Sequence, residues 1–565
     1  MSQRGVRSEG GALFRDPGQD GLLHRAFLRA EGFTAEEVRN HPVVGIANSA
    51  SELNPCNAGL AALAQEVKAG VREAGGLPLE FPTISISEPF TRPTSLYLRN
   101  LMSMDIEEMI STAPIDGVVL LGGCDKTLPA QIMGALSANK PAVALVAGPR
   151  PVSAYQDNQS FTVDDVWPVC EARRAGEVSD QDWQTLEACV CTGVGTCNVL
   201  GTAATMAAVA EVLGFALPAS ALAPAASAAR RAIARATGRR AVQAIRAGLR
   251  PQSLITDQAL ENAVRVVVAM GGSTNAIIHL EAIAGRVGLR IGFDKLQRYS
   301  ASTGYVTRVR PGGPHLLSDL EAAGGIPAVM QRIRTELHLE QTSGTGAPWQ
   351  RYLEETPIPG GDAIAPPDSS ERRALVMLRG NLAPRGAILK TVGHCDPRLL
   401  THRGRAVVFD GIDDLNARID DPDLDVDANS ILVLRGMGPL GAPGMPEVGH
   451  IPIPAKLHRQ GVRDMVRISD ARMSGTSTGT VVLHVTPEAA AGGVLGLLRS
   501  GDEIELDAHN GRLAHCVSEA MLAARQPFVN PQAPQRGFAW LHQRHVLQAD
   551  EGCDFDFLRA GGAAP

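Results

Sequence analysis

Residues 115–149 read IDGVVLLGGCDKTLPAQIMGALSANKPAVALVAGP, and this pattern decides the fold of the first half of the chain. Two continuous apolar runs, 117–123 and 142–148, predict buried strands, and residues 128–138 between them predict a helix. A strand, a helix and a second strand in this order are typical of a parallel sheet that helices cover on both faces. In such sheets the ligand-binding loops follow the carboxyl ends of the strands, which is where CDKT (124–127) stands.

A strand and a helix of the same kind also precede this unit. PVVGIANS (42–49) predicts a strand, SELNPCN (51–57) a loop, and residues 58–76 a helix that ends in glycines. Much further along, TPIPGGDAIAPPDSSERR (356–373) is rich in Pro, Gly and Ser and has no period, which is typical of a linker. We therefore predict an N-terminal α/β domain over residues 1–365.

The second half of the chain has a different texture. Short apolar runs such as RAVVFDG and TVVLHV alternate with Gly- and Pro-containing turns. This alternation predicts a mostly β domain, a barrel or a sandwich, over residues 366–535. The closing residues 536–565 have apolar side chains at spacings of three to four and predict a helical tail. The predicted fold class is α/β, with helices on both faces of the N-terminal parallel sheet.

Composition excludes several classes of function. The chain has 565 residues, with 53 Lys and Arg against 60 Asp and Glu, so its formal net charge is −7. This balance offers no basic surface to nucleic acid or to an anionic membrane. The apolar runs are far shorter than the roughly 18–20 residues that span a bilayer, and MSQRGVRSEGG at the start does not resemble a secretion signal. We expect a cytoplasmic protein with no nucleic-acid or membrane partner.

Three of the nine cysteines share a setting. Cys56, Cys124 and Cys197 each precede a predicted helix, whose N-terminus favours the thiolate that binds metal. Their spacings of 68 and 73 residues mean that a shared metal would be assembled from separate loops. The alternative is that each is a small buried apolar residue. Cys189 and Cys191 form a C-x-C pair on a predicted strand ahead of Cys197 and could compete with it for a ligand role, but we interpret both as structural.

Oxygen ligands and hydroxyl groups stand in similar loops. Asp125 and Lys126 directly follow Cys124, while Glu88 and Glu447 lie in Gly- and Pro-containing loops, where solvated carboxylates are common but hard divalent cations also bind. The run RISDARMSGTSTGTVVLHV (467–485) places Ser474, Thr476, Ser477 and Thr478 before a predicted strand. Such a loop is either a turn or the site of an acidified hydroxyl that serves as a base. GGSTN (271–275) is equally ambiguous between an anion-binding loop and helix packing.

Eight collinear blocks occur from residue 42 to residue 493. They are PVVGIANSASELNPCN, RPTSLYLRNLMSMDIEEMI, DGVVLLGGCDKTLPA, GVGTCNVLGTAATMA, GGSTNAIIHL, RGNLAPRGAILK, GMGPLGAPGMPEVG and RISDARMSGTSTGTVVLHVTPEAAAGG. Together they resemble the dihydroxy-acid and sugar-acid dehydratase family. The resemblance implies that the second domain is a β-barrel and that the site lies between the two domains. Ala219 departs from the family pattern, which commonly has glycine there.

The resemblance also implies a set of roles. Cys56, Cys124 and Cys197 would ligate a 2Fe–2S cluster, and Mg²⁺ would be held by the four residues Glu88, Asp125, Glu447 and Lys126, the last as a carbamate formed with CO₂. Ser474 would be the catalytic base, with Thr476 beside it. Three thiolates leave one position on the cluster open, which suits a Lewis acid.

The tail RGFAWLHQRHVLQADEGCDFDFL (536–558) is similar to that of the aldonate dehydratases of the L-arabinonate and D-xylonate type. The expected reaction takes a proton from C2 and the hydroxyl from C3 of an aldonic acid and gives a 2-keto-3-deoxy acid. The alternatives are a dihydroxy-acid dehydratase acting on 2,3-dihydroxy-isovalerate, or a non-catalytic iron–sulfur redox or sensor protein. The expected partners are a small hydroxy acid and further copies of the chain, as a homodimer or homotetramer. His542 and His545 are either packed or solvated, or reach a substrate across a subunit interface.

Overall fold

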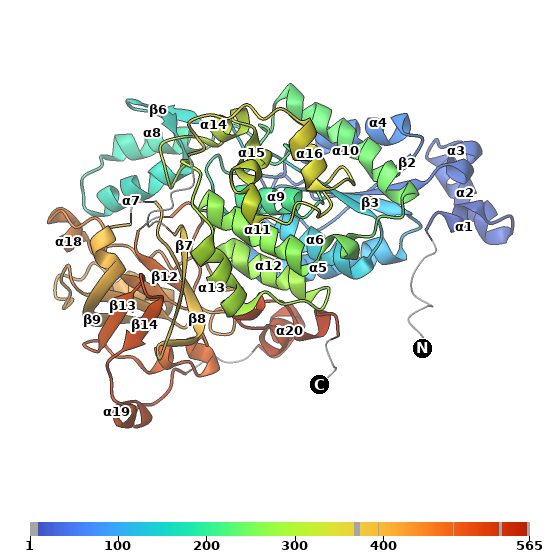
Figure 1. Cartoon of the computed structure of the whole chain (residues 1–565). Coiled ribbons are helices and arrows are strands. Elements are labelled where there is room, and N and C mark those ends of the chain that lie inside the picture. The colour runs from blue at the N-terminus through green and yellow to red at the C-terminus, as the bar shows by residue number, and fades with distance from the viewer. Residues whose placement is uncertain (1–9, 366–372, 394, 478, 530–533, 562–565) are drawn as a thin grey trace.

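The computed structural model describes residues 10–365, 373–393, 395–477, 479–529 and 534–561. Its N-terminal half is built on a parallel sheet with the strand order β2-β1-β3-β4 (Figure 1). The strands are β1 (Val43–Asn48), β2 (Leu77–Pro82), β3 (Gly117–Gly122) and β4 (Ala142–Val146). Every residue of β1, β3 and β4 is buried, as expected for strands with both faces covered.

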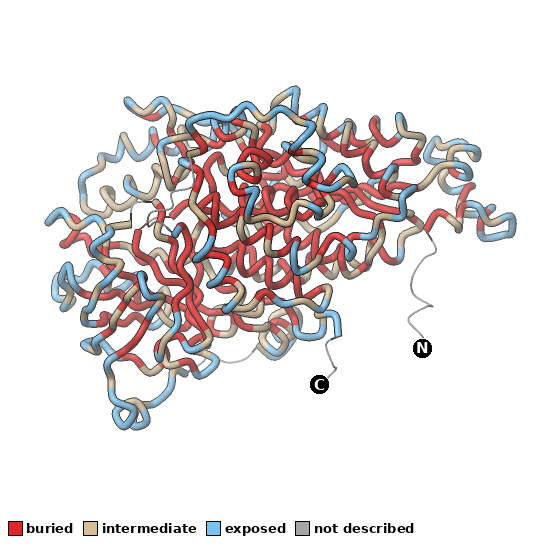
Figure 2. The backbone as a smooth tube through the Cα atoms, viewed as in Figure 1, coloured by how far each residue is buried: buried red, intermediate tan, exposed pale blue. Residues whose placement is uncertain are grey.

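Helices cover both faces of this sheet, as the sequence predicts. One face packs on α4 (Leu60–Glu73) and α10 (Ala228–Arg246), and the other on α5 (Ser95–Thr112) and α6 (Thr127–Ala138). Alternate residues of β3 divide between the two cores, because Val118 and Leu120 face α6 while Val119 and Leu121 face α4. Figure 2 shows the buried backbone concentrated along this sheet and the helices beside it.

A second layer of helices extends the larger core. It contains α9 (Thr202–Val212), α11 (Asp257–Met270), α12 (Asn275–Gly285), α13 (Gly292–Ser302), α14 (Leu317–Ala322), α15 (Gly325–Arg332) and α16 (Trp349–Glu355). At the start of the described chain, α1 (Ala12–Arg15), α2 (Gln19–Ala30) and α3 (Ala35–Asn40) lie at one end of the molecule (Figure 1). None of the helices in the described part of the chain combines the length and the apolar character needed to span a bilayer.

The second domain is a closed barrel with the strand order β10-β11-β12-β8-β7-β14-β13-β9. Its strands are β7 (Leu375–Gly380), β8 (Ala383–Lys390), β9 (Thr401–Asp410), β10 (Ile431–Arg435), β11 (Arg467–Ser469), β12 (Val481–Thr486), β13 (Glu503–Asp507) and β14 (Arg512–His515), with the short helices α17 (Gly411–Arg418), α18 (Ala455–Arg459) and α19 (Glu519–Ala523) between strands or after them. The barrel expected from the resemblance is confirmed. The proposed boundary between residues 365 and 366 meets the segment 366–372, which lies outside the described residues.

The barrel packs on the first domain through one side of β7, β8 and β12. Leu389 and Val482 fill the barrel interior, whereas Ile388, Val481 and Leu483 join the large core of the N-terminal domain. Strand alternation therefore gives β8 and β12 one face for each core. The loop that carries Ser474 directly precedes β12, so it lies at the contact between the domains.

A small lobe follows β4 and corrects one local prediction. It contains β5 (Ser153–Tyr155), β6 (Asn158–Phe161), α7 (Val166–Arg174) and α8 (Asp180–Val190). Cys189 and Cys191 do not lie on a strand as the sequence predicts. Cys189 lies in the last turn of α8, and Cys191 directly follows the helix. The serine N-cap of α8 and its apolar spacing outweigh the strand-like letters ACVC. Cys189 packs beside Tyr155 and Leu186, in agreement with a structural role.

Hydrogen bonds to Glu211 explain how alanine is tolerated at position 219, where the family commonly has glycine. Its φ is 58°, in the left-handed region where glycine is favoured. The turn directs the backbone N–H groups of Ala219, Ser220 and Ala221 at the buried carboxylate of Glu211, over distances of 2.7, 3.1 and 2.8 Å. These three hydrogen bonds stabilise the turn without glycine.

The tail docks on the N-terminal domain through α20 (Gly537–His545) and the residues that follow it. Arg99 donates to the carbonyl oxygens of Gly552 and Cys553 at 2.8 and 2.9 Å. Arg286 forms a two-pronged ion pair with Asp554, with distances of 2.7 and 3.1 Å, and both side chains are fully buried. The tail is therefore an integral part of the larger domain.

We predict that Arg286→Met lowers the free energy of unfolding by about 3–5 kcal/mol, because it leaves the Asp554 carboxylate buried without its partner. The matched control is Arg351→Met, since Arg351 pairs with Glu355 on the surface and its loss should cost less than about 1 kcal/mol. Urea unfolding followed by circular dichroism measures both. Equal effects of the two substitutions would show that the buried pair does not hold the tail.

Candidate active site

Three loops bring the predicted cysteines together. Cys56 lies between β1 and α4, Cys124 between β3 and α6, and Cys197 ahead of α9. The thiol groups of Cys56 and Cys124 lie close enough to shift each other's pKa, and Cys197 is close enough to Cys56 for their charges to interact. Gly123 permits this approach, because a Cβ there would lie 2.8 Å from the carbonyl oxygen of Cys56.

The three sulfur atoms differ in how readily they ionise. The neighbouring thiol of Cys124, helped by Arg150, lowers the pKa of Cys56, whereas the neighbouring Cys56 and burial raise the pKa of Cys124 well above its usual value. Burial and the charge of Cys56 raise the pKa of Cys197 to about 12. One thiolate thus opposes the ionisation of its neighbours. A cationic centre between the three would remove that penalty, which is the property of a soft metal site.

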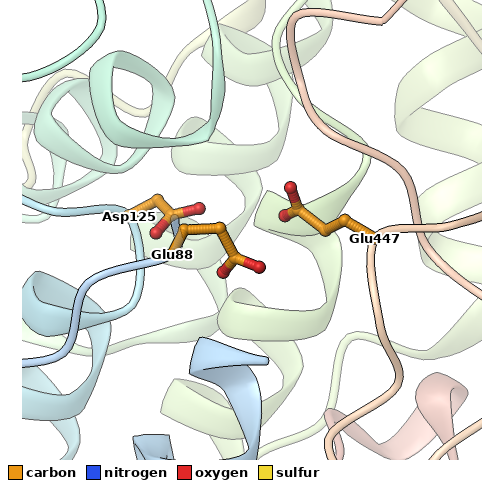
Figure 3. A group of neighbouring side chains, drawn as sticks. All are labelled: Glu88, Asp125 and Glu447. Atoms are coloured by element: carbon orange, nitrogen blue, oxygen red, sulfur yellow. The ribbon is translucent and has the colours of Figure 1, made fainter. Parts of the chain in front are cut away.

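A cluster of carboxylates lies beside the cysteines. Ligand oxygens of Glu88, Asp125 and Glu447 all lie within 4.8 Å of one another. Figure 3 shows that Glu88 and Asp125 come from neighbouring segments of the N-terminal domain, while Glu447 approaches them from the C-terminal domain. Asp125 joins the two clusters, since the Cys124 thiol donates to its Oδ1 at 3.4 Å.

Lys126 provides the positive charge at the centre of these carboxylates. Its Nζ lies 2.6 Å from Asp125, 2.8 Å from Glu447 and 3.2 Å from Glu88, and the side chain is fully buried. Burial alone would lower the pKa of Lys126, but the three carboxylates outweigh burial and raise it. Burial would likewise raise the pKa of Glu88, yet Lys126 and Arg472 lower it to about 2. A cation therefore stabilises this oxygen cluster.

Two further residues reach the same carboxylates, and both stand in motifs whose role the sequence left open. Arg472, two positions before Ser474, is paired with Glu447 and lies 3.5 Å from Glu88. Asn275, the last residue of GGSTN, donates to Glu447 at 2.9 Å and to the carbonyl oxygen of Met473 at 3.1 Å. The GGSTN loop thus orients a site residue, and the alternative that it binds an anion is not needed to explain it.

Ser474 and Thr476 form a hydrogen-bonded pair. Their hydroxyl oxygens lie 2.8 Å apart, and the backbone N–H of Thr476 donates to Ser474 Oγ at 3.3 Å. The indole N–H of Trp167 donates to Thr476 Oγ1 at 2.9 Å. Trp167 lies 309 residues away on α7, so nothing in the local sequence could identify it. Ser477 is buried, and Thr478 lies outside the described residues.

Gly475 joins this pair to the cysteine loops. A Cβ at Gly475 would lie 2.7 Å from the amide nitrogen of Thr202 and 3.0 Å from the Cα of Gly201, so any larger residue would displace the loop. Gly201 and Thr202 start α9, four and five residues after Cys197. The hydroxyl pair therefore packs directly on the segment that carries a predicted cluster ligand.

A cavity of about 1450 Å³ lies beside the site at the contact between the domains. Asp164, Arg310, Thr391 and Cys395 are among its lining residues, whereas the cysteine trio, the carboxylates and Ser474 are not. Lys390 lies next to Thr391, is buried, and has no hydrogen-bond partner for its Nζ among the residues that the structure describes. Burial lowers the pKa of Lys390 to about 8, and the charge of Asp164 opposes this shift. The lining of this cavity is therefore mixed, with apolar residues such as Val376 and Leu400 beside the polar ones, and it does not include the candidate site residues.

Comparison with known proteins identifies the family. Residues 41–352 match the family model described as dihydroxy-acid/6-phosphogluconate dehydratase N-terminal, and residues 364–553 match the corresponding C-terminal model. The chain belongs to this dehydratase family. Its members are hydro-lyases, so the chain has the framework of an enzyme that eliminates water.

Several relatives cover almost the whole chain. A 6-deoxy-6-sulfo-D-gluconate dehydratase of Pseudomonas putida is 44% identical over 551 residues, which is 96% of this chain and 95% of the relative. An L-arabinonate dehydratase of Rhizobium leguminosarum bv. trifolii is 44% identical over 549 residues, covering 96% and 94%. A dihydroxy-acid dehydratase of Methanosarcina barkeri is 34% identical over 548 residues, covering 95% and 98%.

The two tail histidines of this dehydratase-family chain have different surroundings. His542 is buried against Tyr97, Phe538 and Phe555, and burial lowers its pKa to about 4. His545 lies 3.0 Å from Asp556. His542 is therefore a packed residue within its own chain, and a role for either histidine across a subunit interface stays a prediction.

Proposed function

We propose that this chain dehydrates an aldonic acid of the L-arabinonate or D-xylonate type to the 2-keto-3-deoxy acid, with a 2Fe–2S cluster and Mg²⁺. The observation that carries the proposal is the convergence of three chemically distinct groups at one place. A trio of thiols, a trio of carboxylates and a hydroxyl pair are linked through the Cys124–Asp125 contact and the packing of Gly475 on Thr202. A dehydration needs a base, a charge that stabilises the carbanion and an acceptor for the hydroxyl.

The residues present fit the two inorganic groups. Cys56, Cys124 and Cys197 would hold the cluster, because three clustered thiols ionise together only around a cation. Glu88, Asp125 and Glu447 would hold Mg²⁺, which prefers carboxylate oxygens. When bound, the cluster supplies a Lewis acid for the C3 hydroxyl, and Mg²⁺ supplies positive charge beside the substrate carboxylate and C2 oxygen.

Lys126 would take part in the metal-bound state as a carbamate. The ammonium group in the structure already lies where the three carboxylates require a positive charge. Loss of one proton from this ammonium to solvent, followed by reaction of the neutral amine with CO₂ and loss of a second proton, would give an anionic oxygen ligand and make room for Mg²⁺ as the new positive charge. The ammonium and the metal are therefore alternatives at one position, and Mg²⁺ and CO₂ should bind together.

Ser474 would remove the C2 proton, and its neighbours prepare it for that task. Trp167 can only donate, so it directs its N–H to Thr476 Oγ1 and leaves the Thr476 hydroxyl proton free to point at Ser474. With the Thr476 hydroxyl as donor, Ser474 Oγ would accept two hydrogen bonds, from the hydroxyl and the backbone N–H of Thr476. Both stabilise its alkoxide form, which is the base.

The substrate class is supported by the relatives. Relatives named for sugar acids are 37–44% identical to the chain, whereas the dihydroxy-acid dehydratases are 33–34% identical. We therefore favour a polyhydroxylated acid over 2,3-dihydroxy-isovalerate.

The proposal is tested with protein purified without oxygen and offered L-arabinonate, D-xylonate, a hexonate and 2,3-dihydroxy-isovalerate, with and without Mg²⁺. We expect about two irons and two sulfides per chain and Mg²⁺-dependent release of a 2-keto acid from a sugar acid. Release from 2,3-dihydroxy-isovalerate alone would assign the chain to the branched-chain amino-acid pathway. A complete cluster with no release from any acid would favour the redox or sensor function.

Ser474→Ala should lower kcat by about 10²–10⁴-fold, because the C2 proton then has no positioned acceptor. The absorbance of the cluster should remain, since Ser474 is not among its proposed ligands. Steady-state release of the 2-keto acid and the visible spectrum measure the two effects in one sample. Full turnover in this variant would contradict the proposed mechanism.

Cys124→Ser should abolish the visible absorbance of the cluster, because it removes one of three proposed thiolate ligands. Cys170→Ser is the matched control, since Cys170 lies on α7 and is only half-buried. Iron analysis and the visible spectrum after anaerobic reconstitution compare the two. If both variants keep or both lose the cluster, the ligand assignment is wrong.

A further inference from the structure

Arg150 holds the cysteine loops together, although neither the sequence analysis nor the proposed ligand set includes it. It follows β4, and its backbone pairs with the loop ahead of Cys197: Arg150 N–H donates to Thr196 O at 2.9 Å, and Thr196 N–H donates to Gly148 O at 2.9 Å. On the other side of this loop, Gly195 N–H donates to Pro55 O at 3.3 Å, directly before Cys56. The chain around Arg150 therefore fixes the distance between two cysteine loops.

The guanidinium adds contacts to the same loops. Its Nε donates to Thr196 O at 3.1 Å and its Nη2 to Gly195 O at 3.1 Å. Nη2 also lies 3.7 Å from the sulfur of Cys56, and Nη1 is hydrogen-bonded to the sulfur of Cys191. One planar cation thus contacts two carbonyl oxygens and two sulfur atoms.

The loop ahead of Cys197 lies directly against the backbone of Arg150. A Cβ at Gly195 would lie 2.9 Å from the Arg150 amide nitrogen and 2.9 Å from Gly148 O, and Gly195 has a φ of 122°. The loop therefore needs glycine at this point in order to lie against Arg150. Burial alone would lower the pKa of Arg150, but the cysteine sulfur atoms around the guanidinium outweigh burial and raise it.

We propose that Arg150 is a positioning residue for the iron–sulfur cluster, which it holds by spacing the Cys56 and Cys197 loops and by donating an N–H to the sulfur of Cys56. The proposal rests on the proposed function, since it requires the cluster. Hydrogen bonds and positive charge at a cluster sulfur stabilise the reduced form, and so they raise the reduction potential. Cys191 is the second sulfur on this guanidinium and anchors its other edge.

The positional and electrostatic parts of this role are separable by substitution. Arg150→Met has a similar length but neither charge nor donors. Arg150→Gln keeps a donor for the backbone carbonyls and removes the charge. Arg150→Lys keeps the charge but offers no planar fork. The control is Arg173→Met. Arg173 lies on α7, in the small lobe that follows Arg150 in the chain, and it contacts Val178 and Asp180 rather than a cysteine.

We expect Arg150→Met to retain iron about 10–100-fold more weakly against a chelator than the unchanged chain, as is typical when an outer partner of a metal ligand is lost. Its reduction potential, measured by a dye-mediated titration followed by electron paramagnetic resonance, should shift to more negative values. Arg150→Gln should regain iron retention while its potential stays shifted, and Arg150→Lys should regain most of the potential. Arg173→Met should match the unchanged chain in both measurements.

Two results would overturn the proposal, and they differ from failure of the proposed function. Iron retention and potential in Arg150→Met equal to those of the unchanged chain would remove Arg150 from the cluster site and leave the dehydratase proposal intact. Weaker iron retention with an unshifted potential in all three variants would reduce Arg150 to a loop support without an electrostatic role. An unchanged chain that takes up no iron and sulfide under reconstitution would refute both proposals.

Discussion

The site depends on one electrostatic constraint, the burial of Lys126 among three carboxylates. A fully buried ammonium is stable only when opposite charges and hydrogen bonds replace its hydration. Asp125 and Glu88 supply part of this from the N-terminal domain, and Glu447 supplies the rest from the C-terminal domain. Arg472, also from the C-terminal domain, crosses the same boundary to reach Glu88 and Thr94. The two domains are therefore joined by charges, and the joint is also the site.

The same charges explain how the carboxylate cluster could serve both the metal-free state and the proposed metal-bound state. With its carboxylates ionised, the cluster holds two cations, Lys126 and Arg472, against three anions, which leaves one negative charge. Carbamylation of Lys126 would remove the positive charge of the ammonium and add a negative one, a change of two units, and Mg²⁺ would restore those two units. The proposed metal-bound state thus has the net charge of the metal-free one, so the exchange needs no other titration in the surrounding protein.

The sequence predicts the parts of this arrangement that depend on local pattern. Continuous apolar strands such as 117–122 identify the covered parallel sheet, and glycine-bounded loops identify Cys124 and Ser474 as candidates. Contacts between distant segments leave no such trace. Trp167 reaches Thr476 across 309 residues, and Arg150 reaches Cys191 across 41. Cys191 itself was misplaced because a short apolar run at the end of a helix resembles a strand until a cap and a partner are known.

The position of Ser474 follows from the way the domains meet. Its loop leads into β12, whose residues alternate between the barrel interior and the core of the N-terminal domain. Gly475 lets the loop touch Gly201 and Thr202, so Ser474 is positioned by the same segment that carries Cys197. Asn275 binds both Glu447 and the carbonyl of Met473, and it thereby ties the carboxylates to the loop of Ser474. Because the carboxylates and the Ser474–Thr476 pair are each held by residues of both domains, neither domain alone can assemble the site.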